Sequence, residues 1–252
     1  MQLNFSELQE FLDLKAEEFN NPNFIETDPI QIPHRFSKKE DIEIIAFIIA
    51  TIAWGNRKSI ITNGEKLIQL MGNQPHEFVM NYDAQKDFKF VHRTFNEIDL
   101  DFFFRSLHQI YKTSNLENLF AYHSEHKNFK GRIYNFREQF LLAEHLTRSE
   151  KHIANPMKNS SSKRICMYLR WMCRKDNKGV DFGIWDKVPM SELHLPLDVH
   201  TGNVARKLGI LKRTQNDWTS VEEIQETLMK LDPNDPVKYD FALFGLGAFE
   251  GF

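Results

Sequence analysis

The sequence feature that most constrains the fold is the apolar segment Ile42–Ile52. Apart from Glu43 and Thr51, every residue in it is hydrophobic, so a helix formed here is apolar on nearly all sides. Even when extended to Gly55, the segment is too short to span a bilayer. We therefore expect a helix that crosses the middle of a protein core. Ser37 and Glu40 have the spacing of a capping box, which predicts that Ser37 caps this helix.

Helical periodicity recurs along the chain, whereas no stretch shows a convincing strand alternation. We predict an all-α protein, with an N-terminal helix (Phe5–Phe19) and a linker completing residues 1–36, because three prolines in residues 20–36 forbid a continuous helix. Residues 37–252 are predicted to form one helical domain. The 252 residues suffice for a sizeable core, in one domain or in two lobes that share a cleft.

Two cysteines, Cys166 and Cys173, lie seven residues apart in an apolar helical pattern. This spacing fits neither a zinc site nor an iron–sulfur ligand set, so we expect no metal and no cofactor. The N-terminus has the pattern of a polar helix rather than an export signal. Together with the low cysteine count, this favours a cytoplasmic protein with reduced thiols and without a membrane partner.

The overall charge argues mildly against a nucleic-acid partner, because the net charge is −3 and the pI is about 6.4. Basic residues nevertheless occur in pairs, for example Lys163-Arg164, so a local basic face is compatible with the acidic total. Further along, Arg170 and Arg174 are predicted to lie on a solvated helix face. Asp240 lies in an apolar helix, where we expect it on an exposed face; a second buried carboxylate is the alternative interpretation.

Two signals concern helix ends near the C-terminus. Ser220 and Glu223 have capping-box spacing, which predicts a helix from residue 221 to 231 capped by Ser220. Gly245 and Gly247 suit a helix C-terminus.

The stretch HLPLDVHTGNVARKLGIL, residues 194–211, contains the strongest candidate for chemistry. Asp198 precedes a helix predicted for residues 198–208, where its carboxylate can accept amide hydrogen bonds and meets the positive end of the helix dipole. Capping alone accounts for an Asp at this position. The alternative is a catalytic carboxylate. His200 and Thr201 follow, and local packing or hydrogen bonding explains both.

A second candidate lies near residues 155–162, a polar break in the helical pattern. Ser160, Ser161 and Ser162 open a helix that begins with Lys163 and Arg164. Amides at such a helix start can bind phosphate, and cations there oppose the helix dipole, which favours an anionic partner or a special role for Lys163. Capping by the serines is the alternative interpretation.

A third candidate region follows the apolar helix, where Trp54, Asn56 and Arg57 combine an aromatic ring with polar and basic side chains. Trp54 is interpreted either as a core residue or as a platform on which a base stacks.

The order of these parts resembles the helix-hairpin-helix DNA glycosylase superfamily, which has the endonuclease III-like fold. Leu197-Asp198-Val199-His200 is similar to the family's Val-Asp-Thr-His segment, and Lys163 with Ile165-Cys166-Met167 is similar to the lysine nucleophile of its bifunctional members. The order of elements matches over about residues 37–247, and the whole chain looks similar to a bacterial family of uncharacterised proteins. The resemblance implies a two-lobed helical fold with Asp198 as catalytic carboxylate and Lys163 as nucleophile.

The resemblance has departures. Serines occupy the places where the family's hairpin has glycines, which allow amides to approach phosphate closely and permit unusual dihedral angles. The connection from Lys163 to Asp198 is longer than in most of the superfamily, a spacing that resembles the archaeal 8-oxoguanine glycosylases. No cysteine cluster follows Gly247, so the iron–sulfur module of some members is absent.

Three functions therefore remain open. The first is a base-excision DNA N-glycosylase using Asp198, with DNA rather than RNA as the preferred partner. It acts either by simple hydrolysis or, if Lys163 reaches the base pocket, with lyase activity through Lys163. In this interpretation Ser160, Ser161, Ser162, Arg164, His200, Trp54, Asn56 and Arg57 bind nucleic acid. The second is a non-catalytic nucleic-acid-binding module on the same fold. The third, favoured by the acidic pI, is a helical protein-interaction domain.

Overall fold

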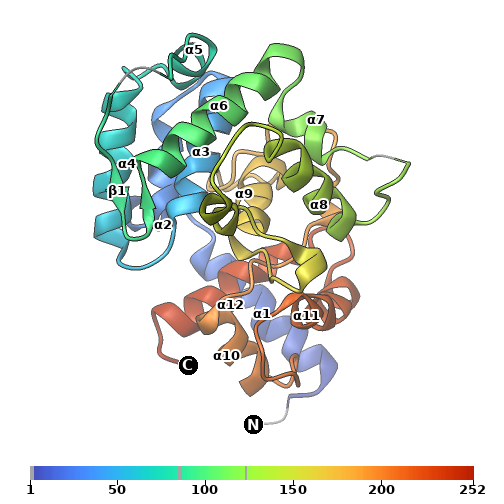
Figure 1. The fold of residues 1–252 in the computed structure, drawn as a ribbon. Coiled ribbons are helices and arrows are strands. Elements are labelled where there is room, and N and C mark those ends of the chain that lie inside the picture. The colour runs from blue at the N-terminus through green and yellow to red at the C-terminus, as the bar shows by residue number, and fades with distance from the viewer. Residues whose placement is uncertain (1–2, 85–86, 123) are drawn as a thin grey trace. The chain divides into compact units, whose positions relative to one another are not determined.

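The computed structural model describes residues 3–84, 87–122 and 124–252. In this part of the chain the protein is mostly helical, with one two-stranded β-hairpin, so the predicted all-α class is confirmed (Figure 1). Its contacts divide the chain into two units, one formed by residues 1–24 and 156–252 and the other by residues 25–155. The boundaries therefore follow residues 24 and 155 rather than residue 36, because the N-terminal helix packs with C-terminal elements.

The middle unit, residues 25–155, is built around the apolar helix α3 (Lys39–Ile52). All side chains from Ile42 to Ile52 are buried, which confirms the predicted core helix. The ring of Phe47 stacks on Phe103 at a centroid distance of 5.6 Å and meets Phe136 and Phe140 edge-on. A helix that is apolar on nearly all sides is thus covered on several sides by aromatic residues from α6 and α8. The remaining elements are η1 (Pro29–Gln31), η2 (Pro33–Arg35), α4 (Arg57–Leu70), α5 (Pro75–Met80), β1 (Val91–His92), β2 (Phe95–Asn96), α6 (Glu97–Thr113), α7 (Leu116–Phe120), α8 (Phe129–Phe140) and η3 (Thr147–His152), while α2 (Asn23–Thr27) spans the boundary.

The discontinuous unit combines the N-terminal helix with the last third of the chain. Its elements are α1 (Phe5–Phe19), η4 (Pro156–Lys158), α9 (Lys163–Cys173), η5 (Met190–Glu192), α10 (Val199–Lys207), α11 (Trp218–Leu231), η6 (Pro236–Lys238) and α12 (Tyr239–Ala248). The predicted helix Phe5–Phe19 is confirmed. Leu8, Leu12 and Ala16 of α1 share an apolar core with residues of α10, α11 and α12.

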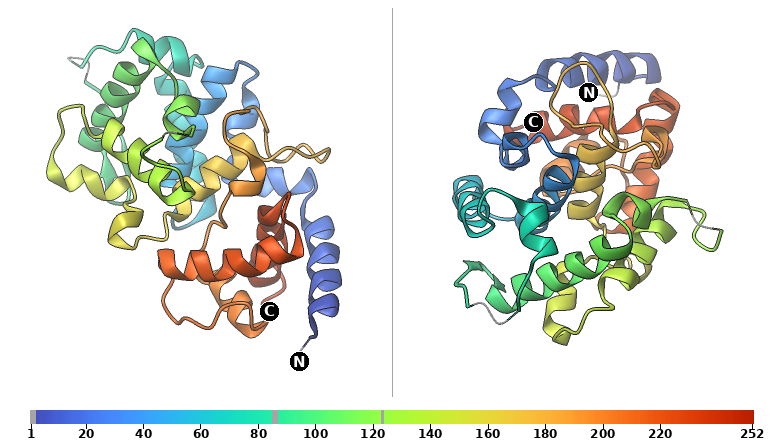
Figure 2. Two further views of the ribbon diagram at one scale, coloured as in Figure 1. Left: turned by 90° about the vertical axis from the view of Figure 1, so that its right-hand side faces the viewer. Right: turned by 90° about the horizontal axis from the view of Figure 1, so that it is seen from above.

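Helix α12 lies at the centre of this unit and packs against both α1 and α10 (Figures 1 and 2). The helices approach closely because α12 has glycines where its neighbours touch it. A Cβ on Gly245 would lie 2.1 Å from the Phe19 ring, and one on Gly247 would lie 3.1 Å from His200 Cβ. The prediction that these glycines end the helix is wrong at Gly245 and Gly247, since both lie inside α12.

The two predicted capping boxes are also wrong. Helix α3 begins after Lys38, which makes no side-chain capping bond, and Ser37 is not its N-cap. Helix α11 begins at Trp218, and its cap is Asp217, whose carboxylate accepts a hydrogen bond from Ser220 N at 3.1 Å. Ser220 is therefore the residue whose backbone N–H donates to the cap, and it is not the cap itself.

Within the described ranges, none of the helices combines the length and the hydrophobicity that crossing a membrane requires.

Candidate active site at Asp198 and Lys163

Asp198 is the N-cap of α10, as the sequence predicts. Its Oδ1 accepts a hydrogen bond from Thr201 N at 2.9 Å. The carbonyl oxygen of Asp198 accepts a further bond from Asn216 Nδ2 at 3.1 Å. Gly202 permits this approach, since a Cβ there would lie 2.6 Å from Asn216 Oδ1. Backbone and side chain of Asp198 are thus both fixed, while its second carboxylate oxygen takes no part in the cap.

This second oxygen faces Lys163, the first residue of α9. Lys163 Nζ lies 3.2 Å from Asp198 Oδ2, and the two side chains are 32% and 15% exposed. The structure therefore brings together the two residues predicted to be catalytic, although 35 residues separate them in the chain. An amine and a carboxylate at this distance can exchange a proton directly and remain accessible to a ligand.

The predicted break before α9 forms a tight turn with left-handed backbone at two residues. Asn159 has φ 61° and Ser162 has φ 53°. The turn is fixed to the start of α11, because Asn159 Nδ2 donates to Asp217 Oδ2 at 2.9 Å and Asn159 O accepts from Trp218 N at 3.2 Å. Asn adopts this conformation readily, and its bonds to α11 hold it there, whereas Ser162 adopts it with some backbone strain. The element before the turn is the 3₁₀ helix η4 rather than an α-helix.

The serines of this turn differ in exposure. Ser162, at 2% exposed, is buried, and its hydroxyl donates to Ser160 O at 3.3 Å. It makes no side-chain capping bond to α9, so the capping interpretation is wrong for Ser162. Ser160 and Ser161 are half-buried, and Ser160 Oγ accepts from Ser162 N. The hydroxyl of Ser162 therefore stabilises the turn itself.

The two other predicted binding residues of this unit flank the pair. Arg164 is half-buried, and burial lowers the pKa of its guanidinium below the ordinary value. A guanidinium remains charged at neutral pH even so. His200 is exposed, and its ring centroid lies 6.4 Å from that of Phe244.

The remaining predicted residues belong to the middle unit. Asn56 caps α4, with its Oδ1 accepting from Ser59 N at 3.1 Å. Trp54 is half-buried, with the Arg93 guanidinium 4.8 Å from its ring centroid and the His92 ring 6.2 Å away. Arg57 is half-buried at the first position of α4. Burial lowers the pKa of His92, which favours the neutral ring, and the charge of Arg93 acts in the same direction.

Sequence reasoning missed a buried set of ion pairs on α9. Arg170 and Arg174 are 4% and 3% exposed, so the predicted solvated face is wrong for both. Arg170 pairs with Asp240 and, through Nε, with Asp181 Oδ1 at 3.2 Å. Arg174 pairs with Asp181 at 3.2 Å and with Asp235 at 2.9 Å. The acidic partners lie up to 70 residues away in sequence, and no local pattern reveals them.

Asp240 is buried as well, at 5% exposed, and the expected exposed position is wrong. Burial is the main cause that raises the pKa of its carboxyl from 3.8 to about 6, and the negative charges of Asp198 and Asp181 contribute. Arg170 acts in the opposite direction without cancelling the burial. Asp240 is therefore a carboxyl group that gains or loses its proton near neutral pH.

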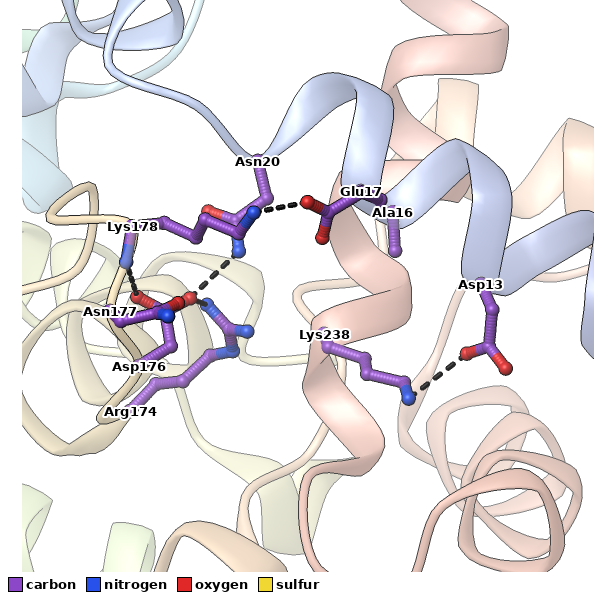
Figure 3. A pocket seen from close by; sticks show the side chains of 9 residues that line it. All are labelled: Asp13, Ala16, Glu17, Asn20, Arg174, Asp176, Asn177, Lys178 and Lys238. Atoms are coloured by element: carbon purple, nitrogen blue, oxygen red, sulfur yellow. Dashed lines mark hydrogen bonds and ion pairs between the residues drawn. The ribbon is translucent and has the colours of Figure 1, made fainter.

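A cavity of about 320 Å³ lies at the other end of α9, beside Arg174 (Figure 3). Asp176 Oδ2 accepts hydrogen bonds there from Arg174 Nη1 at 2.6 Å and from Asn20 Nδ2 at 2.7 Å. Lys238 Nζ lies 2.9 Å from Asp13 Oδ1 across the same cavity. Another cavity, of about 270 Å³, lies in the middle unit against Glu43 and Tyr111. Neither cavity is lined by a predicted site residue.

Among the residues that the structure describes, no group of three or more His, Cys, Asp or Glu side chains is arranged to hold a metal ion. Cys166 and Cys173 are buried, and neither forms a disulfide in this part of the chain.

Residues 28–249 match the model of a family described as a protein of unknown function, DUF2400. The chain belongs to this family. No protein of curated function matches the chain, and no solved structure does.

Proposed function

We propose that this member of DUF2400 acts on DNA as a base-excision N-glycosylase with lyase activity. The observation that carries the proposal is the ion pair between Lys163 Nζ and Asp198 Oδ2 at 3.2 Å, formed by two partly exposed side chains at two helix starts. The resemblance of the segments around both residues to the helix-hairpin-helix glycosylases supports the same assignment. The helix start at Lys163 provides further support, because the first amides of a helix have no partner within the helix and can bind phosphate.

The reaction assigned to the pair begins with a target nucleotide extruded from the duplex. Asp198 takes a proton from Lys163, and the resulting amine attacks C1′ of the sugar as the bond from C1′ to the base breaks; the base leaves with the bonding electrons and takes the proton from Asp198. The nitrogen then gives a second proton to Asp198, which passes it to the ring oxygen as the C1′–O4′ bond breaks. The electron pair on nitrogen forms the C=N bond of a protonated Schiff base between Lys163 and C1′. Asp198 also stabilises the positive charge that develops on the sugar.

The test is a cleavage assay with purified protein in excess over a panel of duplexes, each carrying one damaged base. Each sample is divided between alkali treatment and borohydride reduction, which traps a Schiff base covalently. We expect cleavage of at least one lesion and a trapped adduct with the wild type. Lys163→Gln should abolish the adduct. Asp198→Asn should lower the rate by 10²- to 10⁴-fold, an order of magnitude typical of a general acid–base group.

Two features make these variants informative. Asn caps helices about as well as Asp, so Asp198→Asn removes the charge while keeping the start of α10. Lys212→Gln is the matched control, because Lys212 is an exposed lysine of the same unit and should leave the activity unchanged.

No cleavage of any lesion at enzyme excess would contradict the enzymatic proposal. Salt-sensitive DNA binding without cleavage, weakened by Lys163→Ala or Arg164→Ala but not by Asp198→Asn, would replace it with a binding module. Absence of binding even at low salt would exclude both.

A further inference from the structure

Cationic residues form a row along one face of α9. Lys163, Arg170 and Arg174 are separated by seven and four residues, a spacing that places them on the same side of a helix. Each is paired with a carboxylate: Lys163 with Asp198, Arg170 with Asp240, and Arg174 with Asp235 and Asp181. The partly exposed pair at Asp198 is therefore the outer end of a row that continues into the protein.

The two carboxylates at the outer end, Asp198 and Asp240, are close enough to interact. Their partners on α9 are seven residues apart, which corresponds to about 10 Å along the helix axis. Asp198 caps α10, Asp240 lies in the first turn of α12, and these two helices pack on each other. Cys166, on the same face of α9 between the two cations, is fully buried. The intervening medium is therefore protein rather than water.

In such a medium two charges separated by about 10 Å still interact. With an effective dielectric constant of about 20, the charge of Asp198 raises the pKa of Asp240 by roughly one unit. The charge of Asp240 also reaches Cys166, where burial and this charge together raise the pKa of the thiol.

We propose that Asp240 is a positioning residue for the Lys163–Asp198 pair, and that the presence or absence of one proton on Asp240 sets the electrostatic potential at that pair. A negative Asp240 opposes loss of the proton from the Lys163 amine, whereas a neutral Asp240 does not. This catalytic consequence depends on the proposed function. The coupling of charge between Asp240 and Asp198 does not, and it can be measured without substrate.

Charged and titratable groups that interact with Asp240 come from three parts of the same unit. Arg170 and Cys166 come from α9, Asp181 from the segment after α9, and Asp198 from the start of α10. Arg170 is the cation in direct contact with Asp240, and it is shared with Asp181. Its single charge is thus shared between two buried carboxylates and does not cancel the effect of burial on the pKa of Asp240.

The experiment is a pH titration of the aspartate carboxyl carbons by NMR, with ¹³C-labelled protein and through-bond assignment. In the wild type, the Asp240 signal should titrate near pH 6, and the Asp198 signal should show a second, smaller inflection at the same pH. In Asp198→Asn the midpoint of Asp240 should fall by about one unit, because a neighbouring negative charge is gone. Asp186→Asn, which removes an exposed carboxylate of the same unit, should leave the midpoint unchanged.

An unchanged midpoint of Asp240 in Asp198→Asn would overturn the proposal, as would an Asp198 signal without the inflection near pH 6. A supporting result would then be extended to borohydride trapping. Asp240→Asn should retain trapping but remove the inflection near pH 6 from its pH profile. Since the titration needs no substrate, a failed lesion panel with an intact NMR coupling would discard the glycosylase and keep the coupling. Cleavage of a lesion without the NMR coupling would keep the glycosylase and discard the role of Asp240.

Discussion

Replacing Asp240 by Asn should change how the stability of the protein depends on pH. The pKa of Asp240 is about 6 in the folded protein, whereas its ordinary value is 3.8, and burial is the main cause of the difference. Because the folded state holds this proton more tightly than the unfolded state, the favourable contribution of Asp240 is complete below pH 3.8. It is lost as the pH rises through 6. At 1.36 kcal/mol per pKa unit, the whole loss is about 3 kcal/mol.

Roughly half of this loss falls between pH 5 and pH 8, an interval in which unfolding is easily measured. Asn is nearly isosteric with Asp and does not titrate. The free energy of unfolding of Asp240→Asn should therefore rise relative to the wild type by about 1.5 kcal/mol from pH 5 to pH 8. In Asp240→Asn, Arg170 has lost one partner at every pH. The cost of that loss therefore cancels when the difference from the wild type at pH 8 is compared with the difference at pH 5.

Urea unfolding followed by tryptophan fluorescence is a suitable assay. Three of the four tryptophans, Trp171, Trp185 and Trp218, belong to the unit that contains Asp240. Asp186→Asn is the control, because the Asp186 side chain is 80% exposed. The free energy of unfolding of this variant should follow that of the wild type at every pH. If the free energies of unfolding of Asp240→Asn and the wild type changed in parallel from pH 5 to pH 8, the assignment of a pKa near 6 to the buried Asp240 carboxyl would be refuted.

Three further predictions concern packing, backbone and thiol chemistry. Gly245→Ala should lower the free energy of unfolding by about 1–3 kcal/mol, since the new Cβ meets the Phe19 ring; Phe19→Leu in the same chain should restore part of it, and additive losses would contradict this contact. Asn159→Ala should cost about 1–3 kcal/mol in thermal or urea unfolding, because it strains a left-handed residue and removes the bond to Asp217, whereas an equal cost for Asn159→Gly would show that the backbone conformation contributes nothing. Cys166 should react with a thiol reagent only after unfolding, because its thiol is buried and burial raises its pKa; rapid labelling of Cys166 in native protein, located by mass spectrometry, would disprove this.

Elements governed by local periodicity could be predicted from the sequence. The helix Phe5–Phe19 was predicted at its observed bounds, and the apolar segment Ile42–Ile52 indeed forms a fully buried helix. The cap at Asp198 was also predictable, because the determinants of an N-cap lie within four residues of each other. Helix ends were less predictable where several polar residues compete, as at Asp217 and Ser220.

Features that depend on distant residues could not be predicted. Arg170 and Arg174 look like surface residues in the sequence, because their carboxylate partners become neighbours only after folding. Gly245 looks like a helix end, because the Phe19 ring that requires a residue without Cβ comes from the opposite end of the chain. For the candidate site, sequence similarity indicated Lys163 and Asp198 separately. The 3.2 Å distance between them and the buried Asp240 behind them required the structure.

The discontinuous unit has a consequence for the order of folding. Helix α1 is synthesised before the middle unit, whereas α12, the helix that covers its apolar face, is synthesised after it. The middle unit consists of one continuous stretch and can therefore complete its own core while α1 still exposes Leu8 and Leu12 to solvent. A nascent chain that stops before residue 239 should accordingly carry a folded middle unit and an α1 open to chaperones.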